Sequence, residues 1–213
     1  MRQFKHLFLA LTASALALAA VPASAGVAVK TTRVTVNSAG VPGNARPGDS
    51  SNLPISISAT GRFVAFSDNA PDLVEGDRNF RYDVFVRDRV RGETTRVSVS
   101  SAGAEGNNDS AFDSISANGR FVAFSSLASN LVPGDRNHRG DMFVRDLKRG
   151  KTTLLSVSSE GKQGNSESSF PAISAHNGRF VAFSSLASSL VEGDRHNTAD
   201  TFVRGPLRPS GRP

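Results

Sequence analysis

A unit of about 58 residues occurs three times in this chain of 213 residues, and this repeat limits the fold more than any other feature. The sequence Gly-Arg-Phe-Val-Ala-Phe begins at Gly61 and returns at Gly119 and Gly178. A repeat of this length indicates one structural unit stacked on its own copies, because a single copy cannot bury its apolar face alone.

Three further motifs keep the same spacing. They begin at Gly76, Gly134 and Gly193 (Gly-Asp-Arg), at Phe85, Phe143 and Phe202 (Phe-Val-Arg), and at Thr94 and Thr152 (Thr-Thr-x-x-Ser-Val). A related copy of the last motif, Thr-Thr-Arg-Val-Thr-Val over residues 31–36, precedes the first full unit. Four motifs shared by the first two units, three of which return in the third, predict the same arrangement of elements in each unit.

The four motifs are short, rich in Val, Phe, Ile and Thr, and separated by turn-forming residues, so we interpret each as a strand. No segment after residue 26 has a sustained helical period, and helix is expected to be nearly absent. Residues 121–124 are apolar on both faces, as in an inner strand covered on both sides, whereas 95–99 alternate, as in an outer strand wet on one face.

Such four-stranded units predict an all-β fold of β-propeller-type blades. A β-sandwich would explain the short strands but not the copying of all four at a spacing of 58 residues. We place the repeat domain at 26–204, with units at about 50–101, 108–159 and 166–204, the last incomplete. A lone outer strand is expected at 30–37, and the proline-rich segment 205–213 is expected to be an irregular tail.

The first 25 residues have the features of a secretory signal peptide. Arg2 and Lys5 give a basic start, residues 7–20 are uncharged, and Ala23-Ser24-Ala25 supplies small residues for cleavage after Ala25. The uncharged stretch has about 14 residues, fewer than the roughly 20 that span a bilayer as a helix. The sequence therefore predicts an exported protein, periplasmic or extracellular, without stable membrane insertion.

The repeat resembles a known family. Ile-Ser-Ala-Asn-Gly-Arg-Phe-Val-Ala-Phe over 115–124, with counterparts that begin at Ile57 and Ile173, is similar to the repeat of TolB-like (PD40-type) β-propellers. The Gly-Asp-Arg-Asn turn and the Asp-x-Phe-Val-Arg-Asp strand match exported proteins of that class. The resemblance covers about 30–204 and implies export and protein–protein binding by a propeller face. TolB itself carries an α/β domain before its propeller and binds a peptidoglycan-associated lipoprotein, a role that does not transfer to these repeats.

Three units are fewer than the four to eight blades of closed propellers. Two copies of the chain could form a six-bladed ring, the gene product could be truncated near Gly205, or three blades could persist as an open stack. Edge-strand physics disfavours the open stack. The abrupt departure of the tail from the repeat favours truncation over the homodimer.

Acidic and amide residues repeat in the loop that begins with Gly-Asp-Arg. They are Asp77, Asn79 and Asp83, then Asp135, Asn137 and Asp141, then Asp194 and Asp200 with His196 in place of the Asn. Oxygen ligands at alternate loop positions suit calcium, the only metal or cofactor that the sequence suggests. The middle position holds Arg81, Arg139 or Thr198, and no bidentate Glu follows at the right distance. Capping of backbone N–H groups in the turns by the Asp side chains is therefore the favoured role, with calcium as the alternative.

The charge pattern does not indicate a nucleic-acid-binding surface. The formal net charge of +6 includes Arg2 and Lys5, which the signal peptide would remove. Arginines recur once per unit beside repeated Asp residues, which favours pairing between strands or blades over phosphate binding. They are Arg62, Arg120 and Arg179, and Arg87, Arg145 and Arg204.

No catalytic motif is present. The chain has no Cys, and the three histidines beyond the signal, His138, His176 and His196, lie in turns outside any nucleophile, metalloprotease or P-loop motif. We expect a binding or scaffold module without catalysis, which docks a protein or cell-envelope partner on its loop face. The alternative is a fragment of a secreted propeller hydrolase or lyase that acts on polysaccharide or peptide, which would need a clustered pocket.

Overall fold

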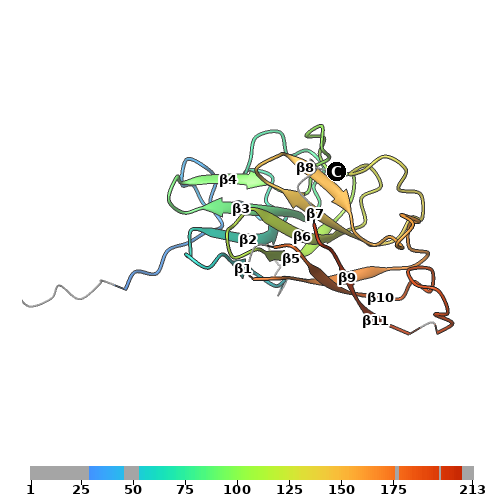
Figure 1. Cartoon of the computed structure of the whole chain (residues 1–213). Helices are drawn as coiled ribbons and strands as arrows, with labels where there is room; N and C mark the ends of the chain where they lie inside the picture. Colours follow the sequence, from blue (N-terminus) through green and yellow to red (C-terminus); the bar gives the residue numbers. More distant parts are fainter. Residues whose placement is uncertain (1–28, 46–52, 176–177, 197, 208–213) are drawn as a thin grey trace, which may run out of the picture. The chain divides into compact units, whose positions relative to one another are not determined.

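The computed structural model describes residues 29–45, 53–175, 178–196 and 198–207. These residues form strands and loops without a helix, and the strands make three antiparallel sheets, shown in Figure 1. The prediction of an all-β chain is confirmed. The signal peptide predicted at 1–25 lies outside the described residues. Within the described part of the chain, no helix has the length and hydropathy that crossing a membrane requires.

The chain divides by its internal contacts into two units, Met1–Thr32 and Arg33–Pro213. The described residues of the first unit, 29–32, are exposed and form no strand. All three sheets belong to the second unit.

The strand order repeats from sheet to sheet. The first sheet contains β1 (Ser56–Ile57), β2 (Phe63–Asp68), β3 (Asp83–Asp88) and β4 (Glu93–Arg96), in that order. The second contains β5 (Ser110–Ile115), β6 (Phe121–Ser126), β7 (Asp141–Asp146) and β8 (Lys151–Leu154), and the third β9 (Ser168–Ile173), β10 (Val181–Ser185) and β11 (Asp200–Arg204). Sheets of four, four and three strands at a fixed spacing are blades of a partial β-propeller, so the predicted fold class, with its last unit incomplete, is confirmed.

Two details of the predicted blade are wrong. The repeat pattern predicts a strand for the Gly-Asp-Arg motif and the family resemblance a turn, and only the turn is correct. The motif lies in the loop between the second and third strands of each sheet, because glycine and aspartate there favour turns. The first strand of each sheet comes from residues just before the Gly-Arg-Phe motif, as in β5 and β9. The strand over 121–124, although buried on both faces as expected, is therefore second in its sheet.

The outer strand also differs from its predicted pattern. β4 ends at Arg96, and Val97 and Ser98 are both fully buried although they are adjacent in sequence. Ser98 turns inward because its hydroxyl donates to the buried carboxylate of Asp83. The expected lone strand at 30–37 is not formed either, since a strand needs a neighbour, and only an isolated bridge joins Val36 to Pro42.

Apolar clusters fill the spaces between successive sheets. One cluster joins the first and second sheets through residues such as Val86, Val97 and Phe124. A second joins the second and third sheets through Val144 and Phe183. The second sheet therefore lies between the other two, and each blade is held by side-chain packing on its neighbour.

Candidate functional site

The predicted acidic residues of the first blade surround an arginine. A guanidinium nitrogen of Arg96 lies 3.1 Å from Asp83 Oδ2 and 3.7 Å from Asp77 Oδ1, and it also contacts Glu105. Carboxylate oxygens of Asp77, Asp83 and Glu105 lie within 4.8 Å of one another. A protein cation thus occupies the place between the carboxylates where a metal ion would lie.

Asn79 does not offer an oxygen to this cluster. Its side-chain nitrogen donates to Asp83 Oδ2 and to the carbonyl of Gly106, both at 3.0 Å. Its oxygen accepts the backbone N–H of Arg81 at 2.7 Å. The turn-capping bond that the sequence assigns to the Asp side chains is made here by Asn79, and the assignment is wrong for the buried Asp83, which is bonded to side chains instead.

The second blade has the same geometry with neutral partners. Leu154 stands at the place of Arg96, and Gln163 at the place of Glu105. The amide of Gln163 donates to Asp135 Oδ1 at 2.8 Å and to Asp141 Oδ2 at 2.9 Å. The change removes one positive and one negative charge together, so both clusters keep the same net charge.

Burial raises the pKa of these carboxyl groups. It raises the pKa of Asp77 and of Asp141 to about 6 and also raises that of Asp83. The Ser98 hydroxyl and the charge of Arg96 act against this shift for Asp83. The clusters are thus buried polar networks whose bonds stabilise the blade, and calcium binding stays a prediction.

In the third blade the same residues are not brought together. Asp200 is exposed and Asp194 half-buried, whereas Asp83 and Asp141 are fully buried. Asp194 Oδ1 accepts the backbone N–H of His196 at 3.1 Å, a turn-capping bond. The covering residues in the other blades come from the outer strand and the hairpin after it, and no such strand pairs with β11 among the described residues.

The repeated arginines divide into two kinds. Arg62 and Arg120 each make an ion pair, with Asp88 at 2.6 Å and with Asp146 at 2.7 Å, as expected. Arg179, the third member of that series, is exposed, and Gly205 stands at the place of Asp88 and Asp146. The second series, Arg87, Arg145 and Arg204, instead donates to backbone carbonyls of the hairpin that each blade packs against. These contacts support the structural interpretation of the arginines.

An aromatic pair on the first strands, with Phe112 half-buried and Phe170 exposed, is a feature that the sequence interpretation missed. Phe112 in β5 and Phe170 in β9 have φ angles of 52° and 56°, a left-handed conformation that is rare for a bulky residue. Each lies where the pairing register shifts by a β-bulge, and their rings meet edge to face with centroids 4.9 Å apart. Phe170 is 62% exposed. Backbone strain at a β-bulge is common at functional surfaces, and here it accompanies an exposed ring at Phe170.

A hollow of about 370 Å³ adjoins this pair. Phe112 and Leu127 give it apolar walls, and Asp109 and the exposed Glu167 add carboxylates. The hollow has a size that holds a few side chains of a partner. We refer to Phe112, Phe170 and the lining of this hollow as the aromatic surface.

Asp113, next to Phe112, fixes the bulge. Its side chain accepts bonds from the Ser56 hydroxyl at 2.7 Å and from the Ser67 hydroxyl at 3.4 Å, both in the first sheet. Burial raises its pKa to about 6. The only sequence signal for this surface is a Phe at the same spacing of 58 residues, just before the quoted repeat motif.

Of the histidines, His138 lines a small hollow with Leu127, next to the aromatic surface. Exposed loop positions hold His138 and His196, as the sequence predicts. His176 lies outside the described residues.

No family model matches this sequence, and no curated protein matches it. Among solved structures, the chain is similar to a protein assigned as TolB from Agrobacterium tumefaciens, at 18% identity and a TM-score of 0.44, over 73% of this chain and 47% of that one. It is similar to the tricorn protease at 18% identity and a TM-score of 0.45, over 78% of this chain and 15% of that one. For dipeptidyl peptidase 4 from Porphyromonas gingivalis the identity is 17% and the TM-score 0.37, over 76% of this chain and 23% of that one.

The chain spans less than half the length of each of these proteins. At these identities the likeness concerns the fold alone, and the assignment of the blades rests on the three sheets of this chain.

Proposed function

We propose that this chain is an exported binding or scaffold module of the cell envelope, without catalysis, and that a protein partner docks on its aromatic surface. The observation that carries the proposal is the pair Phe112 and Phe170. Each holds a left-handed backbone, which costs on the order of 1–3 kcal/mol, and the half-buried ring of Phe112 supports the exposed ring of Phe170. Aromatic side chains supply much of the energy at protein interfaces.

The charges beside the rings indicate the chemistry of the partner. Asp109 and Glu167 line the hollow, and among the described residues no Lys or Arg lines it. Asp109 is 3.8 Å from Arg81, whereas Glu167 is exposed. An extended protein segment that carries apolar side chains and a Lys or Arg suits this lining.

The test is affinity capture from an envelope fraction with the exported chain as bait. Phe112→Asn and Phe170→Asn together remove both rings, and asparagine tolerates a left-handed backbone, so the bulges are retained. Val90→Asn is the matched control, because Val90 is 73% exposed in the turn between β3 and β4. We expect one partner to be enriched by the wild type and the control but not by the double variant.

Equal enrichment by all three baits would contradict the proposal. Hydrolysis of a polysaccharide or peptide by the purified chain, lost in the double variant, would favour the enzyme alternative instead.

A further inference from the structure

In the described part of the chain, β11 forms an open edge of its sheet, whereas the corresponding strands of the first two sheets are each paired with a fourth strand. In the first two sheets, β3 and β7 are paired on one side with β4 and β8. β11 has a neighbour only in β10 among the described residues, and Asp200 at its start is exposed where Asp83 and Asp141 are fully buried. An open edge of this kind accepts a further strand.

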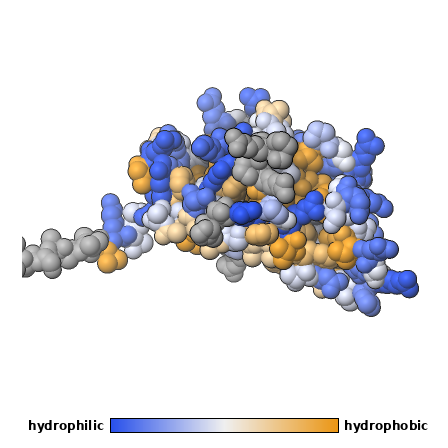
Figure 2. Space-filling view, viewed as in Figure 1, coloured by the Kyte–Doolittle hydropathy of each residue, from blue (hydrophilic) through white to orange (hydrophobic). Residues whose placement is uncertain are grey.

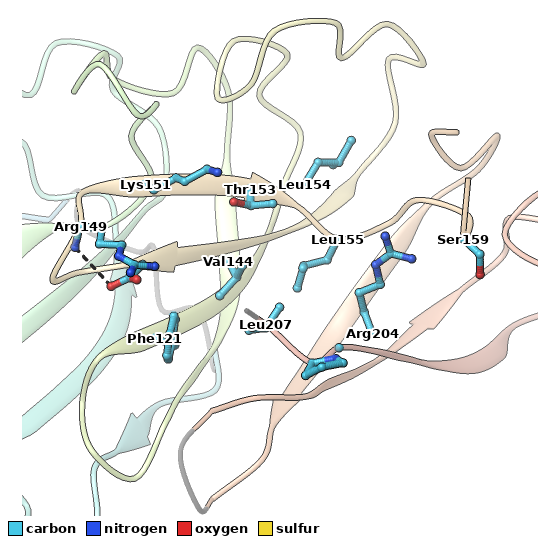
Figure 3. A pocket seen from close by; sticks show the side chains of 13 residues that line it. Phe121, Val144, Arg149, Lys151, Thr153, Leu154, Leu155, Ser159, Arg204 and Leu207 are labelled. Carbon is cyan, nitrogen blue, oxygen red and sulfur yellow. Dashed lines mark hydrogen bonds between the residues drawn. The ribbon is translucent and has the colours of Figure 1, made fainter. Parts of the chain in front are cut away.

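A hollow of about 480 Å³ marks the place of the fourth strand. Figure 3 shows the apolar side chains of Phe121 and Val144 from the second sheet, that of Leu155 just after β8, and the segment from Arg204 to Leu207. At the equivalent place between the first and second sheets, Leu154 of β8 packs into the apolar cluster. Apolar residues also reach the surface over the third sheet in Figure 2.

A serine at this hollow belongs to a series whose other members bind an outer strand. Ser38 Oγ accepts the N–H of Thr94 at 3.1 Å, and Ser101 Oγ accepts the N–H of Thr152 at 3.0 Å. Ser159 is the next member of this series and lines the hollow. A threonine N–H of a further outer strand is the donor that the series predicts for it.

The arginine series points to the same threonine. Arg87 donates to Thr94 Oγ1 at 3.0 Å, and Arg145 donates to Thr152 Oγ1 at 2.9 Å. Arg204 makes the equivalent bonds to backbone carbonyls, at 3.4 Å and 3.1 Å, but no bond from it to a threonine occurs within the described ranges.

The segment 31–36 carries the residues that this edge requires, in the right order. Thr31 stands at the place of Thr94 and Thr152, Arg33 at that of Arg96, and Thr35 at that of Ser98 and Ser156. Val34 stands at the place of Val97 and Leu155, which are 0% and 2% exposed, yet Val34 is half-buried. The segment therefore has the sequence of an outer strand but is not paired in a sheet among the described residues.

The end of the same segment is bonded to the first sheet, whereas β11 belongs to the third. Val36 and Asn37 accept bonds from Thr94 and Arg87 of the first sheet, and Thr35 accepts the N–H of Gly43. The second sheet is packed between the first and the third. Pairing of the segment with the third sheet is therefore expected between two copies rather than within one.

We propose that segment 31–36 of a second copy pairs antiparallel with β11, and that the reciprocal contact closes a dimer with six blades. The register of β3 with β4 and of β7 with β8 places Arg204 opposite Thr31 and Phe202 opposite Arg33. Thr31 then bonds Ser159 and Arg204, Arg33 reaches Asp194 and Asp200, and Thr35 donates to Asp200. The proposal does not depend on the proposed function.

Within the described ranges, a second series of contacts between neighbouring blades also lacks a partner at the outer face of the first blade and at that of the third. The ring of Phe63 packs against Gly119 of the next blade, and the ring of Phe121 packs against Gly178. Phe180 is the third ring of the series and is 43% exposed, while Gly61, the first glycine, has no aromatic side chain against it among the described residues. In the proposed dimer, Phe180 of one copy lies on Gly61 of the other.

Light scattering after size exclusion tests the proposal on the exported chain. We expect twice the mass of one chain for the wild type, and the mass of one chain for Arg33→Glu and for Asp200→Arg. Both residues are exposed in a single copy, so neither change perturbs its core. The doubly reversed variant R33E/D200R restores an opposite-charge pair across the junction and should regain the dimer. Arg136→Glu, in an exposed loop of the second blade, is the control and should remain dimeric.

A synthetic peptide of residues 29–37, added in excess to the wild type, should convert the dimer to single chains with bound peptide. A wild type that stays monomeric, or a dimer that survives both single reversals, overturns the proposal. Open polymers of increasing mass overturn the closure of a six-bladed dimer.

Discussion

Replacement of Arg96 by leucine isolates the role of the charged cluster in the first blade. The side chain of Arg96 is 8% exposed, and those of Asp77 and Asp83 are 2% and 0% exposed, so solvent screens this cluster little. A unit-charge pair at the 3.1 Å that separates Arg96 from Asp83 interacts by about 5 kcal/mol at an effective dielectric constant of about 20. Loss of one partner from a buried pair costs about 3–5 kcal/mol, and we expect R96L to cost this much at neutral pH.

The second blade supplies the compensating change. It has Leu154 and Gln163 where the first has Arg96 and Glu105. The double variant R96L/E105Q should therefore recover about 2–3 kcal/mol, because the introduced glutamine amide can donate to Asp77 and Asp83 as Gln163 does to Asp135 and Asp141.

Urea unfolding followed by far-ultraviolet circular dichroism measures these free energies. Arg91→Leu is the control, since Arg91 is 66% exposed in its side chain, and a change below about 0.5 kcal/mol is expected. The reasoning is refuted if R96L costs no more than this control, or if the double variant is as unstable as R96L alone.

Three single contacts give further predictions. Asp113→Asn should raise the free energy of unfolding by up to about 3 kcal/mol at pH 7 and leave it unchanged near pH 3. The reason is that the folded-state pKa of Asp113 is about 6, so its contribution to stability is complete below about pH 4 and is lost as the pH rises through 6. Urea unfolding at several pH values measures this, and parallel pH profiles of the variant and the wild type would contradict it. The Arg62 side chain lowers the pKa of Asp88 to about 2, so wild-type stability should fall between pH 4 and pH 2, and Asp88→Asn should flatten that decline in acid titrations. Gly119→Ala should lower the melting temperature more than Gly103→Ala, since both have positive φ but only at Gly119 would a Cβ meet the ring of Phe63; equal losses would show that this contact contributes nothing.

Much of the fold could be predicted from the repeat, but the boundaries inside a blade could not. Residues 121–124 are identifiable as a doubly buried strand because their apolar pattern is local. β5, with the sequence Ser-Ala-Phe-Asp-Ser-Ile, could not be predicted as a strand, because a β-bulge in it interrupts the alternation of apolar and polar residues. The alternation over 95–99 misleads for a related reason, since Ser98 turns inward to reach a carboxylate that is distant in sequence.

The candidate site was predictable only in part. The spacing of Asp77, Asn79 and Asp83 indicates one cluster, and the structure brings them together. The spacing could not show that Arg96 fills that cluster, because the arginine is contributed by a strand that meets the loop only in the folded sheet. The aromatic surface depends on two bulges in different blades, and no pattern along the chain reports that Phe112 and Phe170 touch.

The sequence by itself determines the three blades, their spacing and the matching of segment 31–36 to the outer strands, because these depend on residue type repeated at a fixed interval. Tertiary structure alone decides which carboxylates are buried, which rings are exposed, and that β11 is left with an open edge among the described residues. Those properties arise from contacts between blades, and whether a side chain finds a partner there depends on what the neighbouring blade supplies.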